Sequence, residues 1–175
     1  FEIKKNVKFL NTHNIFIFGI KPNSPSDQFG YFFTKRKKGL NFVNKFIEKP
    51  NKNKAKYIIR NGGYWNSGIF FLRKDSLLNN FQKYQKNIYQ NSLKAVIKSK
   101  LKNNIYFLNK KAFDKNKAKS FDYGILEKTK NINAIKLNIP WSDLGSWKEI
   151  CKIYNKLKTK YQKRKNIFYR PWGRY

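Results

Sequence analysis

The sequence predicts an α/β protein with a mixed sheet. Short apolar runs typical of buried strands alternate with segments whose apolar residues recur at helical spacing. Hydrophobic residues make up 40% of the 175-residue chain, which is too many for a disordered basic tail. The length suits one domain or most of one. We therefore expect a packed core in spite of a formal net charge of +31.

Strands are predicted where apolar runs are bounded by turn residues. Residues 15–20 form a continuous apolar run closed by Lys21-Pro22, as in a strand buried on both faces. A loop over residues 21–30 follows, and the basic run 35–38 is typical of an exposed hairpin tip. Further strands are expected at 42–47, at 64–72 with an interruption at Asn66-Ser67-Gly68, and at 132–139.

Helices are predicted from caps and from apolar spacing. Asn51 can cap a short helix that ends at Gly62-Gly63, and Ser120 can cap one that carries Ile125 and Leu126. A last amphipathic helix is expected from Gly145 to about Gln162. Apolar residues at helical spacing predict two more, one with Leu77, Leu78 and Phe81 and one with Leu93, Val96, Ile97 and Leu101.

Composition excludes several functional classes. The 34 Lys and 6 Arg are spread along the whole chain and do not form one basic surface, so we expect no specific nucleic-acid partner. Lysine has A/T-rich codons, so an A/T-rich genome would explain the high lysine content without a partner. No apolar run reaches 18 residues, which excludes a membrane span. A single cysteine, Cys151, and a single histidine, His13, exclude a disulfide framework and a zinc cluster. With no signal-peptide pattern and no Met, we expect a cytoplasmic piece of a larger product.

The acidic residues are few, and their placement is informative. Glu48, Asp122, Glu127 and Asp143 each lie at a strand end or a helix start, where open α/β sheets bind ligands. Glu48 can accept sugar hydroxyls beside Lys49, a cation for a phosphate. Asp143 can hold a magnesium ion that also bridges substrate phosphates. Taken singly, these features fit a simpler explanation better than a site: Glu48-Lys49 as a surface ion pair at a turn and Asp143 as a helix N-cap.

Five ordered strings together resemble the mannose-1-phosphate guanylyltransferases. The last residues, Tyr169-Arg170-Pro171-Trp172-Gly173-Arg174-Tyr175, look like the start of the cupin-type mannose-6-phosphate isomerase domain of the bifunctional members. The five strings are Phe18-Gly19-Ile20-Lys21-Pro22, Phe46-Ile47-Glu48-Lys49-Pro50, Tyr64-Trp65-Asn66-Ser67-Gly68-Ile69-Phe70, the segment from Phe121-Asp122-Tyr123-Gly124 to Thr129, and Trp141-Ser142-Asp143-Leu144-Gly145-Ser146-Trp147.

The resemblance implies a Rossmann-like nucleotide-diphospho-sugar transferase fold and an enzyme of GDP-mannose and polysaccharide biosynthesis. Such an enzyme converts mannose 1-phosphate and GTP into GDP-mannose and pyrophosphate with Mg2+. The resemblance also implies site residues. Glu48 would bind mannose hydroxyls, Lys49 the sugar phosphate and Asn66 the sugar edge. Gly30 would let the backbone approach the hexose, and Asp122 would orient the site. Asp143 would ligate Mg2+, and Lys49 and Asp143 would be the catalytic residues.

The same resemblance predicts the domain organisation. Residues 1–148 would be the C-terminal portion of a nucleotidyltransferase domain, 149–166 a basic connecting helix and 167–175 the start of a truncated isomerase domain. The family's Gly-rich loop, which cradles the GTP phosphates, has no counterpart here, so we expect this chain alone to be inactive and its sheet to have an unpaired edge. Two alternative functions stay open: a non-catalytic remnant that binds sugar phosphates or a polyanion, and a related sugar nucleotidyltransferase. A homo-oligomer is compatible with each of these functions.

Overall fold

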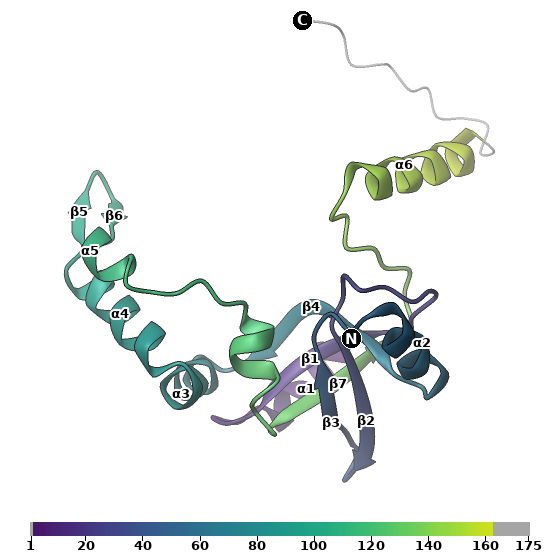
Figure 1. The fold of residues 1–175 in the computed structure, drawn as a ribbon, viewed down its shortest axis with the longest axis horizontal. Helices are drawn as coiled ribbons and strands as arrows, with labels where there is room; N and C mark the ends of the chain where they lie inside the picture. The colour runs from purple at the N-terminus through teal and green to yellow at the C-terminus, as the bar shows by residue number, and fades with distance from the viewer. Residues whose placement is uncertain (1, 163–175) are drawn as a thin grey trace, which may run out of the picture. The chain divides into compact units, whose positions relative to one another are not determined.

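The computed structural model describes residues 2–162 and divides the chain into two compact units, Phe1–Ile139 and Pro140–Tyr175 (Figure 1). In the first unit the elements are α1 (Glu2–Asn6), the 3-10 helix η1 (Val7–Phe9), β1 (Ile15–Ile20), β2 (Tyr31–Lys37), β3 (Leu40–Ile47), α2 (Lys52–Arg60), β4 (Tyr64–Leu72), α3 (Lys74–Tyr84), α4 (Lys86–Ile97), β5 (Lys100–Lys102), β6 (Ile105–Phe107), α5 (Lys110–Phe113), the π-helix η2 (Asp122–Leu126) and β7 (Ile132–Leu137). The second unit contributes α6 (Trp147–Gln162).

A sheet that closes on itself forms the body of the first unit. Its strand order is β1-β4-β2-β3-β7, and β7 returns to pair with β1. The β1–β7 pair is parallel and the other pairs are antiparallel, so the predicted mixed sheet is confirmed. Each of these strands has a neighbour on both sides. The expectation of an unpaired edge was therefore wrong for this sheet, because closure gives both sides of every strand a partner.

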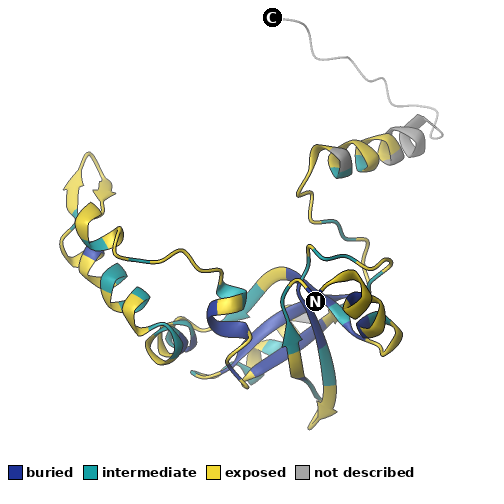
Figure 2. Ribbon diagram, viewed as in Figure 1, coloured by how far each residue is buried: buried dark blue, intermediate teal, exposed yellow. Residues whose placement is uncertain are grey.

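β1 is the centre of the core. All six of its residues are buried, as the continuous apolar run predicts (Figure 2). Ile15 and Ile17 pack into one apolar cluster with Phe32, whereas Phe16 and Phe18 pack into a second cluster on the opposite face. Successive side chains of a strand alternate between faces, so a run without polar residues is what burial on both faces requires.

Tight turns and caps fix the elements around the core. The basic run predicted as a hairpin tip at 35–38 lies next to the turn: residues 35–37 end β2, and the turn itself is Lys38 and Gly39, with φ of 49° and 79°. Positive φ at both turn residues is the geometry of the two-residue hairpin turns that match strand twist. The predicted cap of α2 is also confirmed, since the Asn51 side chain accepts a hydrogen bond from the Lys54 N–H at 2.9 Å.

The interruption predicted in β4 is a bulge within a continuous strand. Ile17 of β1 faces Phe70, but Gly19, two residues further along, faces Asn66. Two extra residues of β4 are thus accommodated between these pairs, and Gly68 provides a φ of 75°. Bulges of this kind redirect side chains and are frequent next to functional sites.

The segment between β4 and β7 is mainly helical and differs from the prediction at one point. The two predicted amphipathic helices correspond to α3 and α4, but Leu101 lies in β5 and outside α4. The helix ends at Ile97, and the β5–β6 hairpin turns at Asn103 and Asn104, whose φ values are 49° and 60°. Asparagine tolerates this left-handed backbone conformation, so Asn103-Asn104 can form a hairpin turn. The spacing of apolar residues carries no information about such a turn.

The second unit is described up to residue 162. Its helix α6 begins at Trp147, two residues after the predicted start. The sequence string proposed as the start of an isomerase domain lies outside the described residues. None of the helices within residues 2–162 combines the length and the apolar character that crossing a membrane would take.

Candidate functional site

Strand pairing brings Gly30, Glu48 and Asn66 side by side. The start of β2 pairs with the end of β3 on one side and with the start of β4 on the other. Gly30 immediately precedes β2, Glu48 immediately follows β3, and Asn66 lies in β4. The Asn66 N–H donates to the Gly30 carbonyl at 2.7 Å. Residues that are 18 positions or more apart in the sequence thus meet at one end of three adjacent strands.

Position 30 has no room for a side chain, because neighbouring side chains of the protein itself occupy that space. A Cβ at position 30 would lie 2.5 Å from Glu48 Oε2 and 2.9 Å from Phe46 Cζ. The resemblance implied that this glycine makes room for the hexose. The structure shows that it first makes room for the Glu48 carboxylate, which lies directly against the Gly30 backbone.

Asp122 joins this group from a distant part of the chain. The Asn66 side-chain amide donates to Asp122 Oδ1 at 2.9 Å. Asp122 opens the π-helix η2, which is held in place because the Phe121 ring packs against Phe70 and Phe81. Single π-turns are rare and are often found at functional sites.

Glu127, one of the four acids whose placement in the sequence is informative, completes the group, although no role in the site was predicted for it. Its Oε1 accepts a hydrogen bond from the Glu48 N–H at 3.1 Å, across 79 positions of sequence. This bond ties the end of β3 to the end of η2. Two sequence signals pointed to it: its place at a strand end or helix start, and its presence in the same string as Asp122, five residues further on.

Burial and like charge raise the proton affinity of the site. Burial, together with the negative charges of Asp122 and Glu127, raises the pKa of Glu48 to about 7, and the Lys49 cation opposes the rise. Burial also raises the pKa of Asp122, against the hydrogen bonds that it accepts and the charge of Lys49. Strong perturbation of this kind in a cluster of carboxylates is typical of functional sites.

Glu48 Oε2 has a special place in this cluster. It is buried, and none of the described residues donates a hydrogen bond to it. Burying an acceptor that receives no hydrogen bond costs about 1–3 kcal/mol of folding free energy. Such an atom in a native structure is therefore a candidate for a hydrogen bond from a bound ligand. A sugar hydroxyl is a donor that would satisfy it.

Lys49 adds a cation at the edge of the cluster. Its side chain is exposed and its backbone has a φ of 43°, in the left-handed region. That conformation is uncommon for lysine and turns the chain sharply between Glu48 and the buried Pro50. The charge of Lys49 opposes the rise in the pKa of both Glu48 and Asp122, so the exposed ammonium group acts on both carboxylates.

Asp143 belongs to the second unit, Pro140–Tyr175, whereas the other predicted site residues belong to the first, Phe1–Ile139. Its carboxylate is exposed, and a Cβ at Gly145 would lie only 2.7 Å from Asp143 Oδ2. The glycine thus leaves open space against one carboxylate oxygen. No cluster of three or more His, Cys, Asp or Glu side chains within the described part of the chain could hold a metal ion. A magnesium ion at Asp143 would therefore take its other ligands from substrate phosphates and water, as Mg2+ commonly does.

Comparison with known proteins identifies the family. The model of the family described as "Nucleotidyl transferase" matches residues 2–160, nearly the whole chain. The chain belongs to the nucleotidyl transferase family. Among curated nucleotidyl transferase relatives, mannose-1-phosphate guanylyltransferase 2 of Escherichia coli O157:H7 is 32% identical over 167 residues, which are 90% of this chain and 35% of that protein.

Two further relatives are named for polysaccharide synthesis. The alginate biosynthesis protein AlgA of Pseudomonas aeruginosa is 30% identical over 80% of this chain and 30% of its own length. The xanthan biosynthesis protein XanB of Xanthomonas campestris pv. campestris is 34% identical over 78% of this chain and 29% of its own. This nucleotidyl transferase chain thus spans about a third of the length of the curated relatives it matches.

Solved structures agree on the fold. A mannose-1-phosphate geranyltransferase from Thermus thermophilus superposes with a TM-score of 0.73 at 20% identity, covering 87% of this chain and 44% of that one. A mannose-6-phosphate isomerase from Helicobacter pylori gives a TM-score of 0.71 at 27% identity, covering 81% and 56%. The predicted relationship to the nucleotidyl transferases is therefore confirmed by sequence, and the mixed α/β architecture by structure.

Proposed function

We propose that this chain carries the sugar-binding part of a mannose-1-phosphate guanylyltransferase with the Rossmann-like fold of nucleotide-sugar transferases. The reaction would join mannose 1-phosphate to the guanylyl group of GTP, giving GDP-mannose and pyrophosphate, for polysaccharide synthesis. Membership of the nucleotidyl transferase family and relatives named for guanylyl transfer, alginate and xanthan support this reading.

One observation carries the sugar-binding assignment. The buried Glu48 Oε2 lies against the Gly30 backbone and has no donor among the described residues, while the Asn66–Asp122 hydrogen bond lies beside it. This arrangement offers a hydrogen-bond acceptor of the kind that a hexose hydroxyl would satisfy. Asp122 and Glu127 hold Asn66 and Glu48 in place, so they would position the groups that touch the sugar.

The chemistry calls for positioning and charge neutralisation. A phosphate oxygen of mannose 1-phosphate attacks the α-phosphorus of GTP, the new P–O bond forms, and the bond to the leaving pyrophosphate breaks. Lys49 would hold the attacking phosphate by charge, and Asp143 would hold Mg2+. When bound, Mg2+ neutralises the charge that develops on the phosphate oxygens. Neither a nucleophilic side chain nor a covalent intermediate is needed.

A calorimetric titration of this chain with GDP-mannose and, separately, with GDP tests the proposal. It is run with and without Mg2+, at salt high enough to screen the lysines. We expect GDP-mannose to bind with Mg2+ and Glu48→Gln to weaken that binding about tenfold, the size of one charge-assisted hydrogen bond, with GDP binding unchanged.

Asp143→Ala serves as the second variant, and it should remove the dependence on Mg2+ while the circular dichroism spectrum stays the same. Magnesium dependence that survives in Asp143→Ala would remove Asp143 from the site. If the wild-type chain binds no GDP-mannose at all, it is a non-catalytic remnant, and the sugar-binding proposal fails for it.

A further inference from the structure

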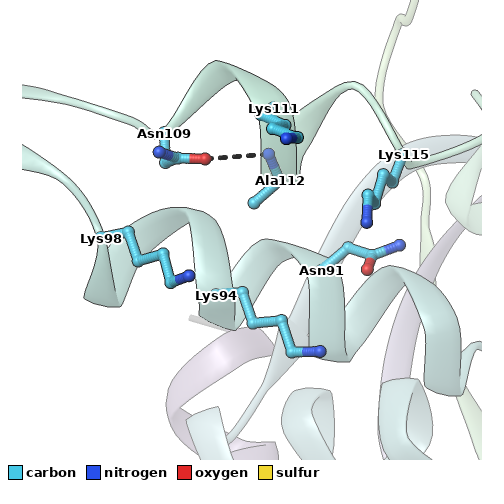
Figure 3. A pocket seen from close by; sticks show the side chains of 7 residues that line it. All are labelled: Asn91, Lys94, Lys98, Asn109, Lys111, Ala112 and Lys115. Atoms are coloured by element: carbon cyan, nitrogen blue, oxygen red, sulfur yellow. Dashed lines mark hydrogen bonds between the residues drawn. The ribbon is translucent and has the colours of Figure 1, made fainter.

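A lysine-lined cleft lies in the helical segment between β4 and β7, outside the group around Glu48. Its volume is about 360 Å3, and its two walls are α4 and the segment that contains α5 (Figure 3). Figure 3 shows lysine side chains from both walls around the open space, with Asn91 between them. The lining residues are Asn91, Lys94, Lys98, Asn109, Lys111, Ala112 and Lys115.

The two walls are joined by defined contacts. The Asn109 N–H donates to the carbonyl of the fully buried Ala95 at 3.0 Å, and the Asn116 amide donates to Ser92 Oγ at 3.3 Å. The Asn109 side chain also caps α5 by accepting from the Ala112 N–H at 3.0 Å. These hydrogen bonds form the cleft in the absence of a ligand, so the protein loses less conformational entropy when a ligand binds.

The cleft and its surroundings hold almost no negative charge. An adjoining cavity of about 480 Å3 shares Asn91 and Lys115 and is lined further by Lys117 and Lys119. Among the residues that the structure describes, none of those lining either cavity is acidic. Residues 86–119 contain ten lysines and one acid, Asp114, which is ion-paired with Lys110. Lysines that line one cleft without a counter-charge repel one another, and a multivalent anion relieves that repulsion.

We propose that this cleft binds a phosphoanhydride chain, either free, as in pyrophosphate and tripolyphosphate, or as the triphosphate of a nucleotide. Four ammonium groups around one concave space suit an anion that carries several charges on neighbouring phosphates, and lysine binds phosphate as a point charge. The Asn91 and Asn109 amides can add neutral donors. Residues 86–119 contain no arginine, so the guanidinium forks that recognise nucleic-acid bases are absent from this segment.

The test compares two variants of equal net charge in the full chain. Lys94→Gln/Lys111→Gln removes one lysine from each wall of the cleft, and Lys35→Gln/Lys37→Gln removes two exposed lysines from β2. Each protein is titrated calorimetrically with pyrophosphate, tripolyphosphate, GTP and a single-stranded oligonucleotide in about 0.15 M salt, where charges beyond roughly 8 Å are screened. Circular dichroism checks that both variants are folded.

We expect tripolyphosphate to bind the wild type and the β2 variant alike, and the cleft variant about tenfold more weakly for each lysine removed. GTP that binds as tightly as tripolyphosphate identifies the nucleotide as a source of the ligand, whereas weaker GTP binding identifies the free phosphate chain. Equal losses in the two variants would overturn the proposal, because binding would then follow net charge alone. An oligonucleotide that binds the cleft more tightly than every phosphate chain would also overturn it.

Discussion

Glu48 makes the stability of the folded chain sensitive to pH. Its pKa of about 7 lies above the ordinary value of 4.5, so the folded chain holds a proton that the unfolded chain has released. Below pH 4.5 both states are protonated. Between about 4.5 and 7 the free energy of unfolding falls with rising pH, and above 7 the loss is complete.

Glu48→Gln should weaken this decline, leaving only the part that Asp122 contributes through its own raised pKa. We expect the variant to be more stable than the wild type at pH 8 by roughly 1–2 kcal/mol, after discounting for the solvent that reaches the half-buried carboxylate, and equal to it at pH 4. Urea unfolding at the two pH values measures the difference. A variant that shows the same decline between pH 4 and 8 would contradict the assignment.

Glu127→Gln provides the matched control. The amide oxygen can still accept from the Glu48 N–H, but the negative charge that helps raise the Glu48 pKa is gone. The pKa of Glu48, followed by carboxyl NMR in the folded variant, should therefore decrease.

At the scale of elements, the sequence predicted correctly those strands and helices whose formation depends on neighbouring residues alone. The run at 15–20 gave β1 because burial on both faces excludes polar residues, and Asn51 marked the start of α2 because its side chain satisfies a free N–H. The β5–β6 hairpin was missed because Leu101 continues the helical spacing past the true end of α4. Glu127 was noted for its placement but given no role, because only tertiary structure shows that it reaches Glu48.

The cap of α2 gives a prediction at this scale. Asn51→Ala should destabilise the chain by about 1 kcal/mol, since the Lys54 N–H loses its acceptor. Asn53→Ala, at an exposed position inside the same helix, is the control, and it should be neutral or slightly stabilising because alanine favours helix. Urea unfolding of the two variants measures both effects, and equal stabilities would argue against the cap.

At the scale of the whole molecule, charge opposes compactness. A net charge of +31 repels itself most strongly at low ionic strength. Raising sodium chloride from about 10 mM to about 150 mM shortens the screening length from roughly 30 Å to 8 Å. We expect the melting temperature to rise by several degrees, since about 1 kcal/mol corresponds to roughly 2–4 °C at this chain length. Equimolar sucrose in place of salt is the control, and a melting temperature indifferent to salt would refute the expectation.

The closed sheet also determines when each strand can pair during synthesis on the ribosome. β1 lies between β4 and β7, and its parallel partner β7 is separated from it by more than a hundred residues. A growing chain that has emerged only as far as β4 leaves one side of β1, its most apolar strand, without backbone partners until Ile132–Leu137 leaves the ribosome. Contacts this distant in sequence form slowly, so the nascent chain passes through a long interval in which β1 is open to chaperones and to other nascent chains.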